Sequence, residues 1–435
     1  MMEFGSNFLY RLLNVIPGGA HTYSRGFDQF PSNAPQILKR GKGAYVYDYE
    51  EKEYLDYGMA LRAVILGYAH PEVNKRVMQA IEYGNNLTRP SLIELEAAEM
   101  FVDLIDSAEM VKFAKNGSNV TTAAVKLARA YTGRDYVARC ADHPFFSFDD
   151  WFIGSTVVDK GVPKAIKEFT LTFKYGDIQD LERLFESYPN KIACVIMEPA
   201  TTGHPPEGYL QKVREVCHKN GALFILDEMI TGFRWHLKGA QYLYSVESDL
   251  CTFGKAMANG FSVAALGGKR EIMKLGSIEF EGQERVFLLS TTHGAEMSGL
   301  AAFIATVNFM KHVDVIGHIW NYGRMLMELM NKTAKEYGIQ DYFTVNGVEC
   351  SPYYVCYDKN KNVSLEFKTL FMQEMVKNGV LMPWIALSYA HSEKELEITA
   401  EAVRKSLRTY SLALEDGVEK YLQGHIIKPV FRKYN

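Results

Sequence analysis

Two apolar runs in the middle of the chain each stop abruptly at an acidic residue. Residues 192–197 precede Glu198, and residues 222–226 precede Asp227. Both runs are short, partly β-branched and without the polar alternation of a half-exposed strand. Runs of this kind are typical of parallel strands that are buried on both faces of a sheet.

The sequence between and after these runs predicts a βαβ unit and its neighbouring strand. Residues 208–220 carry apolar side chains at helical spacing, and Gly221 follows at the position where a helix commonly ends. Residues 249–256 form the third piece of this stretch, and Lys255 lies near its end. Ligands of open α/β sheets bind at the carboxyl ends of the strands. Asp227 and Lys255 are both expected there.

The remaining pattern predicts an α/β protein with a mostly parallel central sheet flanked by helices, and a smaller α+β domain. A chain of 435 residues is too long for one simple core. We expect an N-terminal segment (1–75) that joins the small domain, a large domain (76–310), and a small C-terminal domain (311–435). Further helices are predicted at 8–16, 71–81, 92–104, 120–131, 181–188, 298–307, 320–337, 367–378 and 394–414, a hairpin at 43–57, and strands at 110–114, 136–140, 288–290, 343–345 and 353–357.

Composition narrows the functional classes. The chain is 47% hydrophobic and 23% charged, with a net charge of −4 and no basic cluster, which argues against nucleic acid as a partner. Its six cysteines show no metal-binding spacing and read as reduced core residues of a cytoplasmic protein. We see no signal peptide, and no uncharged apolar run reaches membrane-spanning length.

An acid and a lysine at neighbouring strand ends suit pyridoxal 5'-phosphate. This cofactor needs an amine to form a Schiff base with its aldehyde, and a carboxylate to keep its pyridine nitrogen protonated. Lys255 would supply the amine and Asp227 the carboxylate. The alternative is a strand-end acid and an ordinary solvated lysine, but Lys255 lies in an apolar, glycine-flanked setting.

Two other segments match the needs of such a cofactor. Gly117 and Ser118 lie between a predicted strand and a predicted helix, where backbone N–H groups and the helix dipole favour a phosphate. The alternative reading makes Ser118 and Asn119 simple helix caps. Residues 142–151 form an aromatic loop, from which Phe145 could stack on a cofactor ring. A packed aromatic cluster is the other reading.

Three longer motifs carry a resemblance to a known family. They span residues 130–135, 226–234 and 249–268. The sequence resembles the class III aminotransferases, which are fold-type-I pyridoxal-phosphate enzymes, and within them the glutamate-1-semialdehyde 2,1-aminomutase-like proteins. The resemblance extends over nearly the whole chain, and it places Lys255 on the Schiff-base lysine.

The resemblance also implies an assembly and further site residues. It implies a homodimer with shared active sites, in which Thr291 reaches the phosphate bound by the neighbouring subunit. Gly117 and Ser118 would contact the phosphate, Glu198 would lie beside the cofactor, and Arg25 would meet a substrate carboxylate.

The sequence departs from the family pattern at the phosphate turn (116–119), at residues 144–146 where the family usually has Tyr-His-Gly, and on the substrate side. The aminomutase tryptophan near the substrate aligns with Leu61, next to an unexpected Arg62, and its late glutamate aligns with Pro383. We therefore expect an aminotransferase that moves an amino group from an amino-acid donor to a keto or aldehyde acceptor. Arg25 and Arg62 favour an acidic acceptor, or they are structural ion-pair residues. The aminomutase itself and a non-catalytic relative are the alternatives.

Overall fold

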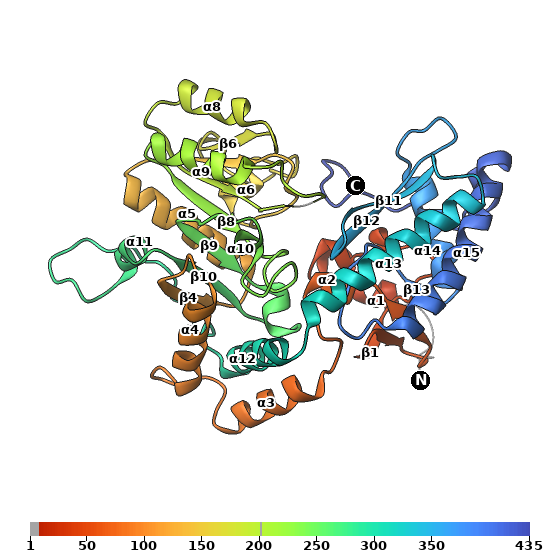
Figure 1. Cartoon of the computed structure of the whole chain (residues 1–435), viewed down its shortest axis with the longest axis horizontal. Helices are drawn as coiled ribbons and strands as arrows, with labels where there is room; N and C mark the ends of the chain where they lie inside the picture. The colour runs from red at the N-terminus through yellow and green to blue at the C-terminus, as the bar shows by residue number, and fades with distance from the viewer. Residues whose placement is uncertain (1–7, 201) are drawn as a thin grey trace. The chain divides into compact units, whose positions relative to one another are not determined.

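A seven-stranded sheet organises the larger of two units in the computed structural model (Figure 1). Every neighbouring pair runs parallel except those of β10, which is antiparallel to both β4 and β9. The predicted, mostly parallel sheet is therefore confirmed. In spatial order the strands are β4 (Met110–Ala114), β10 (Ala264–Gly268), β9 (Leu250–Phe253), β8 (Leu223–Asp227), β7 (Ile192–Met197), β5 (Tyr136–Cys140) and β6 (Thr170–Phe173).

The structure describes residues 8–200 and 202–435, which divide into two units. The larger unit holds Pro71–Ile316 and Phe431–Asn435, and the smaller unit holds the described residues up to His70 together with Gly317–Val430. Relative to the expected boundaries after residues 75 and 310, the changes of unit fall after His70 and Ile316. The last five residues group with the larger unit because Phe431 packs into its core.

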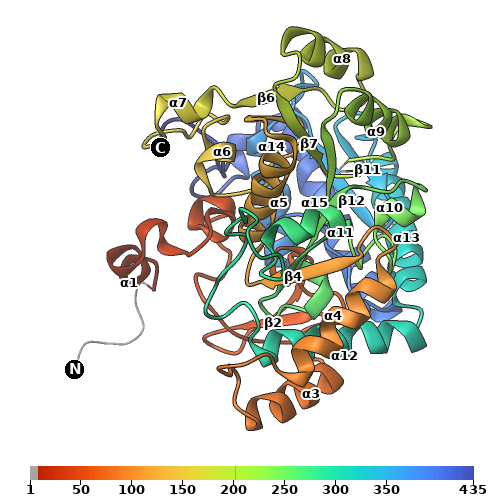
Figure 2. The ribbon, with the colours of Figure 1, turned by 90° about the vertical axis from the view of Figure 1, so that its left-hand side faces the viewer.

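Side chains alternate between the two faces of the sheet, so each central strand contributes to two separate hydrophobic cores. Val195, Met197, Phe224 and Leu226 face a cluster that includes side chains of α8 (Ile178–Ser187) and α9 (Tyr209–Lys219). The residues between them face a cluster with α5 (Gly117–Thr132), which lies against the sheet (Figure 2). This alternation puts Asp227 on the same face of the sheet as α5.

Two strands of this unit, β6 and β10, were not predicted, and one predicted strand does not form. No strand forms at 288–290, because Leu288 and Leu289 pack into the core from an irregular segment without joining a strand ladder. The other elements of the larger unit are α3 (Pro71–Glu82), α4 (Leu92–Leu104), α6 (Asp150–Ile153), α7 (Lys164–Lys167), α10 (Ala240–Leu243), η4 (Lys255–Ala258), α11 (Arg270–Met273), η5 (Lys274–Gly276) and α12 (Met297–His312).

The smaller unit is α+β and combines both ends of the chain. β3 pairs in parallel with β13, which joins the N-terminal segment to the C-terminal part. Its sheet runs β1 (Leu38–Lys42), β2 (Tyr45–Asp48), β3 (Glu53–Asp56), β13 (Val380–Leu381), and β11 (Phe343–Val348) pairs with β12 (Ser351–Cys356). Helices are α1 (Phe8–Val15), α2 (Met59–Arg62), α13 (Val315–Glu336), which begins at the change of unit, α14 (Leu365–Lys377) and α15 (Glu393–Asp416), with η1 (Pro17–Gly19), η2 (Tyr23–Arg25), η3 (Phe27–Gln29) and η6 (Val418–Lys420).

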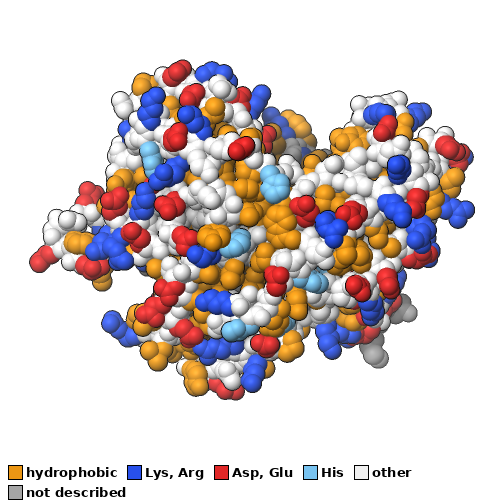
Figure 3. Space-filling view, in the orientation of Figure 1, with side chains coloured by type: hydrophobic (Ala, Val, Ile, Leu, Met, Phe, Trp, Pro, Cys, Tyr) orange, Lys and Arg blue, Asp and Glu red, His pale blue; other side chains and the backbone are white. Residues whose placement is uncertain are grey.

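On the face shown in Figure 3, acidic and basic side chains are interspersed. Among the described residues, no single helix has the length and apolar composition to cross a membrane, and α12 and α13 meet those criteria only when taken together.

Candidate active site

Asp227 ends β8, and its carboxylate is enclosed. It is 1% exposed, and its Oδ1 accepts the Met229 N–H at 3.0 Å and the Thr252 hydroxyl at 2.9 Å. Among the described residues both hydrogen bonds end on Oδ1, which leaves Oδ2 to meet a cation. Burial raises the pKa of Asp227 to about 6, although these donors and the charge of Lys255 favour the ionised form.

Lys255 lies just beyond the end of the adjacent strand, β9. It has a left-handed backbone with φ of 44° and opens η4, while Gly254 before it is extended. The lysine is half-buried, and its charge acts on Asp227. The structure therefore brings the two predicted residues into one neighbourhood at the carboxyl ends of β8 and β9.

Met229 connects three parts of the site. Its N–H binds Asp227, and its sulfur lies 2.7 Å from where a Cβ on Gly254 would be and 3.0 Å from where a Cβ on Gly117 would be. A larger residue at either glycine would collide with it. The strand-end acid, the lysine turn and the start of α5 thus meet around the Met229 side chain, which no sequence pattern singled out.

The first turn of α5 offers backbone N–H groups at the positive end of the helix. Asn116 caps this helix, because its side-chain oxygen accepts the Asn119 N–H at 3.0 Å. Ser118 and Asn119 are therefore not the cap, contrary to the alternative reading. Ser118 is 4% exposed, and its hydroxyl accepts the Phe148 N–H at 3.1 Å. Gly117 and Ser118 are left in the position that a phosphate favours.

Phe145 and Phe146 differ sharply in exposure. Phe145 is 46% exposed, whereas Phe146 is 2% exposed and belongs to the core. Phe145 rests edge-on against Phe152, with ring centroids 5.6 Å apart. Of the two, only Phe145 keeps a ring face for stacking.

Glu198 follows β7 and is held by a histidine that the sequence did not suggest. Glu198 is 2% exposed, and its N–H donates to His143 Nδ1 at 2.9 Å. His143 is 1% exposed, and burial lowers its pKa to about 3, so the ring is neutral. The only sequence signal was its place directly after the β5 strand.

Glu228, beside Asp227, has a structural role. It is 0% exposed and accepts the Ala240 N–H at 2.9 Å, the Gln241 N–H at 2.7 Å and the Thr231 hydroxyl. Burial nevertheless raises its pKa to about 7, and the charge of Asp227 adds to the rise. Glu228 thus holds the segment that follows the site.

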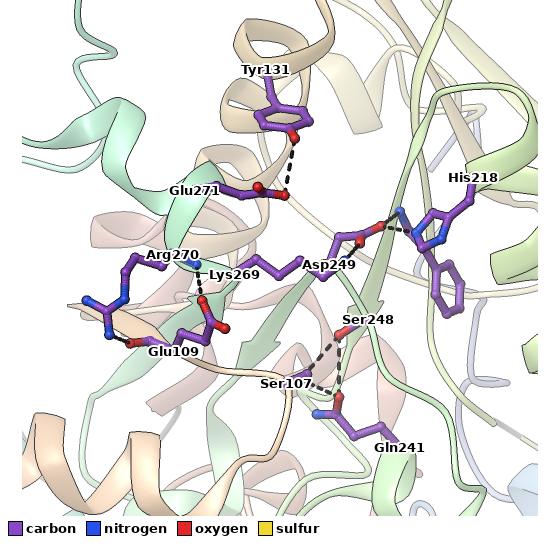
Figure 4. A network of polar contacts seen from close by, with 11 residues as sticks. Ser107, Glu109, Tyr131, His218, Gln241, Ser248, Asp249, Lys269, Arg270 and Glu271 are labelled. Carbon is purple, nitrogen blue, oxygen red and sulfur yellow. Dashed lines mark hydrogen bonds and ion pairs between the residues drawn. The ribbon is translucent and has the colours of Figure 1, made fainter.

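A separate polar network holds the other end of β9 (Figure 4). Asp249 precedes this strand, is 2% exposed, and accepts Lys269 Nζ at 2.5 Å and the Phe224 N–H at 2.8 Å. Its Oδ2 also lies 2.8 Å from His218 Nε2. Burial opposes the charge, but these partners together hold the pKa of Asp249 below its usual value. β9 is thereby fixed at the end opposite Lys255.

Thr291, Arg25 and Arg62 are not tied to this centre by the structure. Thr291 is exposed in the irregular segment before α12, where its carbonyl accepts the Gly294 N–H at 3.2 Å. Arg25 and Arg62 belong to the smaller unit. Their contact with a substrate stays a prediction, as does the contact of Thr291 with a phosphate.

Arg62 ends a strained turn. All four residues of α2 (Met59–Arg62) have positive φ, between 38° and 68°. Such a conformation costs roughly 1–2 kcal/mol per residue. Asp56 holds it: Oδ1 accepts the Gly58 N–H at 2.8 Å, and Oδ2 accepts the Met59 N–H at 3.0 Å and the Tyr68 hydroxyl at 2.6 Å. Strain of this kind concentrates at functional sites.

The larger unit fits pyridoxal phosphate on its own chemistry. A buried carboxylate with a raised pKa is stabilised by a cation such as a protonated pyridine nitrogen. Lys255 lies close by, the first turn of α5 suits a phosphate, and Phe145 has an open ring face. The fold and the site therefore define a fold-type-I pyridoxal-phosphate enzyme.

The chain belongs to the class III aminotransferase family, whose model matches residues 28–385. It is 32% identical over 424 residues to glutamate-1-semialdehyde 2,1-aminomutase of Sulfurihydrogenibium azorense, covering 91% of this chain and 96% of that protein. It is 33% identical over 414 residues to the same-named protein of Clostridium tetani, covering 90% and 97%.

Solved structures of pyridoxal-phosphate enzymes have the same fold as this chain. The FumI protein of Sphingopyxis sp. MTA144, in its PLP internal aldimine form, superposes with a TM-score of 0.85 at 25% identity, covering 96% of this chain and 97% of that one. An omega-transaminase from Sphaerobacter thermophilus gives a TM-score of 0.81 at 24% identity, covering 94% and 98%. The predicted family, fold type and cofactor are confirmed: this is a class III pyridoxal-phosphate enzyme, a transaminase or a closely related aminomutase.

Proposed function

We propose that the protein is an aminotransferase that moves an amino group from an amino-acid donor to a keto or aldehyde acceptor. The observation that carries the proposal is the pairing of buried Asp227 with Lys255 at adjacent strand ends, around Met229. The bound cofactor supplies an aldehyde that condenses with amines and a cationic ring that withdraws electrons.

The residues of the chain have separate tasks in this proposal. Lys255 would hold the cofactor through its amine, and the same amine, when free, would serve as the general base and acid of the site. Asp227 would keep the ring nitrogen protonated. Gly117, Ser118 and a partner's copy of Thr291 would hold the phosphate, while Phe145 would stack on the ring and Glu198 would lie beside it.

We propose that the acceptor is a sugar derivative or an acidic small molecule. Arginine meets carboxylate and phosphate with paired donors, and both Arg25 and Arg62 lie in segments that the family resemblance assigns to the substrate side. Leu61 and Pro383 replace the aminomutase residues that handle glutamate semialdehyde. These replacements favour a different acceptor.

A second candidate is glutamate-1-semialdehyde 2,1-aminomutase, the name of the relatives that share about a third of their residues with this chain. The two functions differ in whether a separate amino donor is required. A non-catalytic relative that only binds the cofactor is a third reading, and the presence of both Asp227 and Lys255 weighs against it.

We also propose a cytoplasmic homodimer with shared active sites. All six cysteines are buried and form no disulfide among the described residues, which suits a reducing compartment. Large apolar side chains are exposed on α3, α4 and the segment between them: Met78, Ile81, Tyr83, Leu87, Leu92 and Leu95. A second copy would cover them. Light scattering at micromolar concentration should give twice the chain mass of 49.3 kDa, and a monomer would contradict this part.

The deciding experiment is a half-reaction screen. Purified protein with pyridoxal phosphate is mixed with single amino donors, and loss of the lysine-bound cofactor absorbance is followed together with the keto product. A transaminase converts at least one donor stoichiometrically without an acceptor. Conversion of glutamate semialdehyde with no donor would instead assign the aminomutase. The variant Lys255→Ala should show neither the absorbance nor turnover, and normal turnover in that variant would refute the proposal.

A further inference from the structure

His143 is a buried imidazole whose protonation state the geometry settles. A backbone N–H can only donate, so the 2.9 Å contact with Glu198 N makes Nδ1 the acceptor and places the ring proton on Nε2. Within the residues that the structure describes, Nε2 is buried without a hydrogen-bond partner. A buried N–H donor without an acceptor lowers the stability of the fold. We therefore infer that His143 does more than fill space in the core.

His143 is part of a frame around the two residues that follow β7. Glu198 is held through its N–H by His143. Pro199 is held through its carbonyl, which accepts the Tyr175 hydroxyl at 2.7 Å. Asp142, next to His143, accepts the Tyr175 N–H at 2.7 Å, and the rings of Tyr175 and His143 lie 5.3 Å apart. The backbone of Glu198 and Pro199 is therefore held by hydrogen bonds to His143 and Tyr175, whose rings pack together.

The same loop is anchored at its other end to α5. The Phe146 carbonyl accepts the Thr121 hydroxyl at 2.8 Å, and the Phe148 N–H donates to Ser118 at 3.1 Å. Phe145 lies between these anchors and His143. Its position relative to both the start of α5 and the end of β7 is thus determined by a few hydrogen bonds.

We propose that His143 is a positioning residue for the cofactor site, because its Nδ1 joins the loop that carries Phe145 to the strand end that carries Glu198. The inference rests on the proposed roles of Phe145 and Glu198 at the cofactor. His143 itself acts through the Glu198 backbone and takes no part in the chemistry.

The test compares two replacements of the imidazole. His143→Leu removes the acceptor and strands the Glu198 N–H. His143→Asn keeps an acceptor oxygen at the position of Nδ1. Cofactor-free protein of each is titrated with pyridoxal phosphate, following affinity, the absorption maximum and the visible circular dichroism of the bound cofactor. We expect affinity to fall at least tenfold with a shifted maximum in the leucine variant, and to return to within about threefold of wild type in the asparagine variant.

Two further variants separate positioning from general damage. His391→Leu is the matched control, because His391 is also fully buried and its Nδ1 accepts the Ser388 N–H at 3.1 Å, but it lies in the smaller unit. It should lower the melting temperature and leave the cofactor spectrum unchanged. Tyr175→Phe removes the tie to Pro199 and should weaken cofactor affinity in the same direction as His143→Leu, even where that variant fails to fold.

The inference is overturned if His143→Leu folds and binds the cofactor within twofold of wild type. It is also overturned if His143→Asn is as impaired as the leucine variant, since an acceptor at Nδ1 would then not be what matters. Wild-type protein that binds the cofactor but converts no donor would refute the proposed transaminase and leave the inference on His143 intact.

Discussion

Replacing Asp227 with asparagine tests whether its buried negative charge destabilises the cofactor-free fold and serves the cofactor. Asparagine has nearly the same shape, and its side-chain oxygen can still accept from Met229 and Thr252 as Oδ1 does. The change therefore removes a charge and little else. In the cofactor-free protein that charge is buried without the pyridine cation that it serves.

The size of the effect follows from the pKa of Asp227. The difference between about 6 in the fold and the usual 3.8, at about 1.36 kcal/mol per pKa unit, corresponds to about 3 kcal/mol. A raised pKa means that the folded protein binds the proton more tightly than the unfolded chain. The destabilisation is thus absent at acid pH, grows between 3.8 and 6, and is complete above that range.

Thermal unfolding of the cofactor-free protein is the assay. At pH 8 the asparagine variant should melt about 5–10 °C above wild type, with roughly half that gain at pH 5. Pyridoxal phosphate should stabilise the variant less than wild type, and kcat should fall by about 10²–10³ because the ring nitrogen loses its carboxylate. A variant that is less stable than wild type at both pH values would refute the reasoning.

Asp249→Asn is the matched control and predicts the opposite sign. Asp249 is also buried, but Lys269, the Phe224 N–H and His218 hold its pKa below the usual value. A lowered pKa stabilises the fold above the unfolded-state value and is lost as the pH falls. The variant should therefore melt below wild type at pH 8, by a margin that shrinks towards acid pH, with an unchanged cofactor spectrum.

Three further outcomes are expected. Gly254→Ala places a Cβ 2.7 Å from the Met229 sulfur and should weaken cofactor affinity at least tenfold by titration, whereas unchanged affinity would show that Met229 can move aside freely. Phe431→Ala removes a ring 6.4 Å from Phe152, which supports the aromatic loop, and should lower the melting temperature and the visible circular dichroism together; a change in stability alone would separate the tail from the site. Arg62→Lys should raise KM for an acidic acceptor about tenfold with the cofactor absorbance unaltered, and an unaffected KM would remove Arg62 from the substrate side.

The fold does not distinguish an aminotransferase from an aminomutase, whereas an assay of the reaction does. Relatives named as aminomutases and a solved omega-transaminase resemble this chain over nearly its full length. Leu61, Arg62 and Pro383, where we propose that the substrate side departs from the aminomutase, lie in the smaller unit.

The sequence by itself determined the strands that end at Asp227 and near Lys255, since buried parallel strands are continuous apolar runs and their ends are marked by polar residues. It also identified the family and the cofactor through motifs whose residues are consecutive. Local patterns of this kind need no knowledge of what packs beside them.

Tertiary structure decided what depends on side chains from distant segments. Met229 became the centre of the site because two glycines from other elements close on its sulfur. His143 gained its role from a backbone N–H 55 positions away. Asn116, two residues before Ser118, caps the helix because its side-chain oxygen accepts the Asn119 N–H. Leu288 packs into the core without joining a strand. The sequence shows which residues are apolar and which can cap a helix. Only the packing of distant segments determines which groups these residues contact.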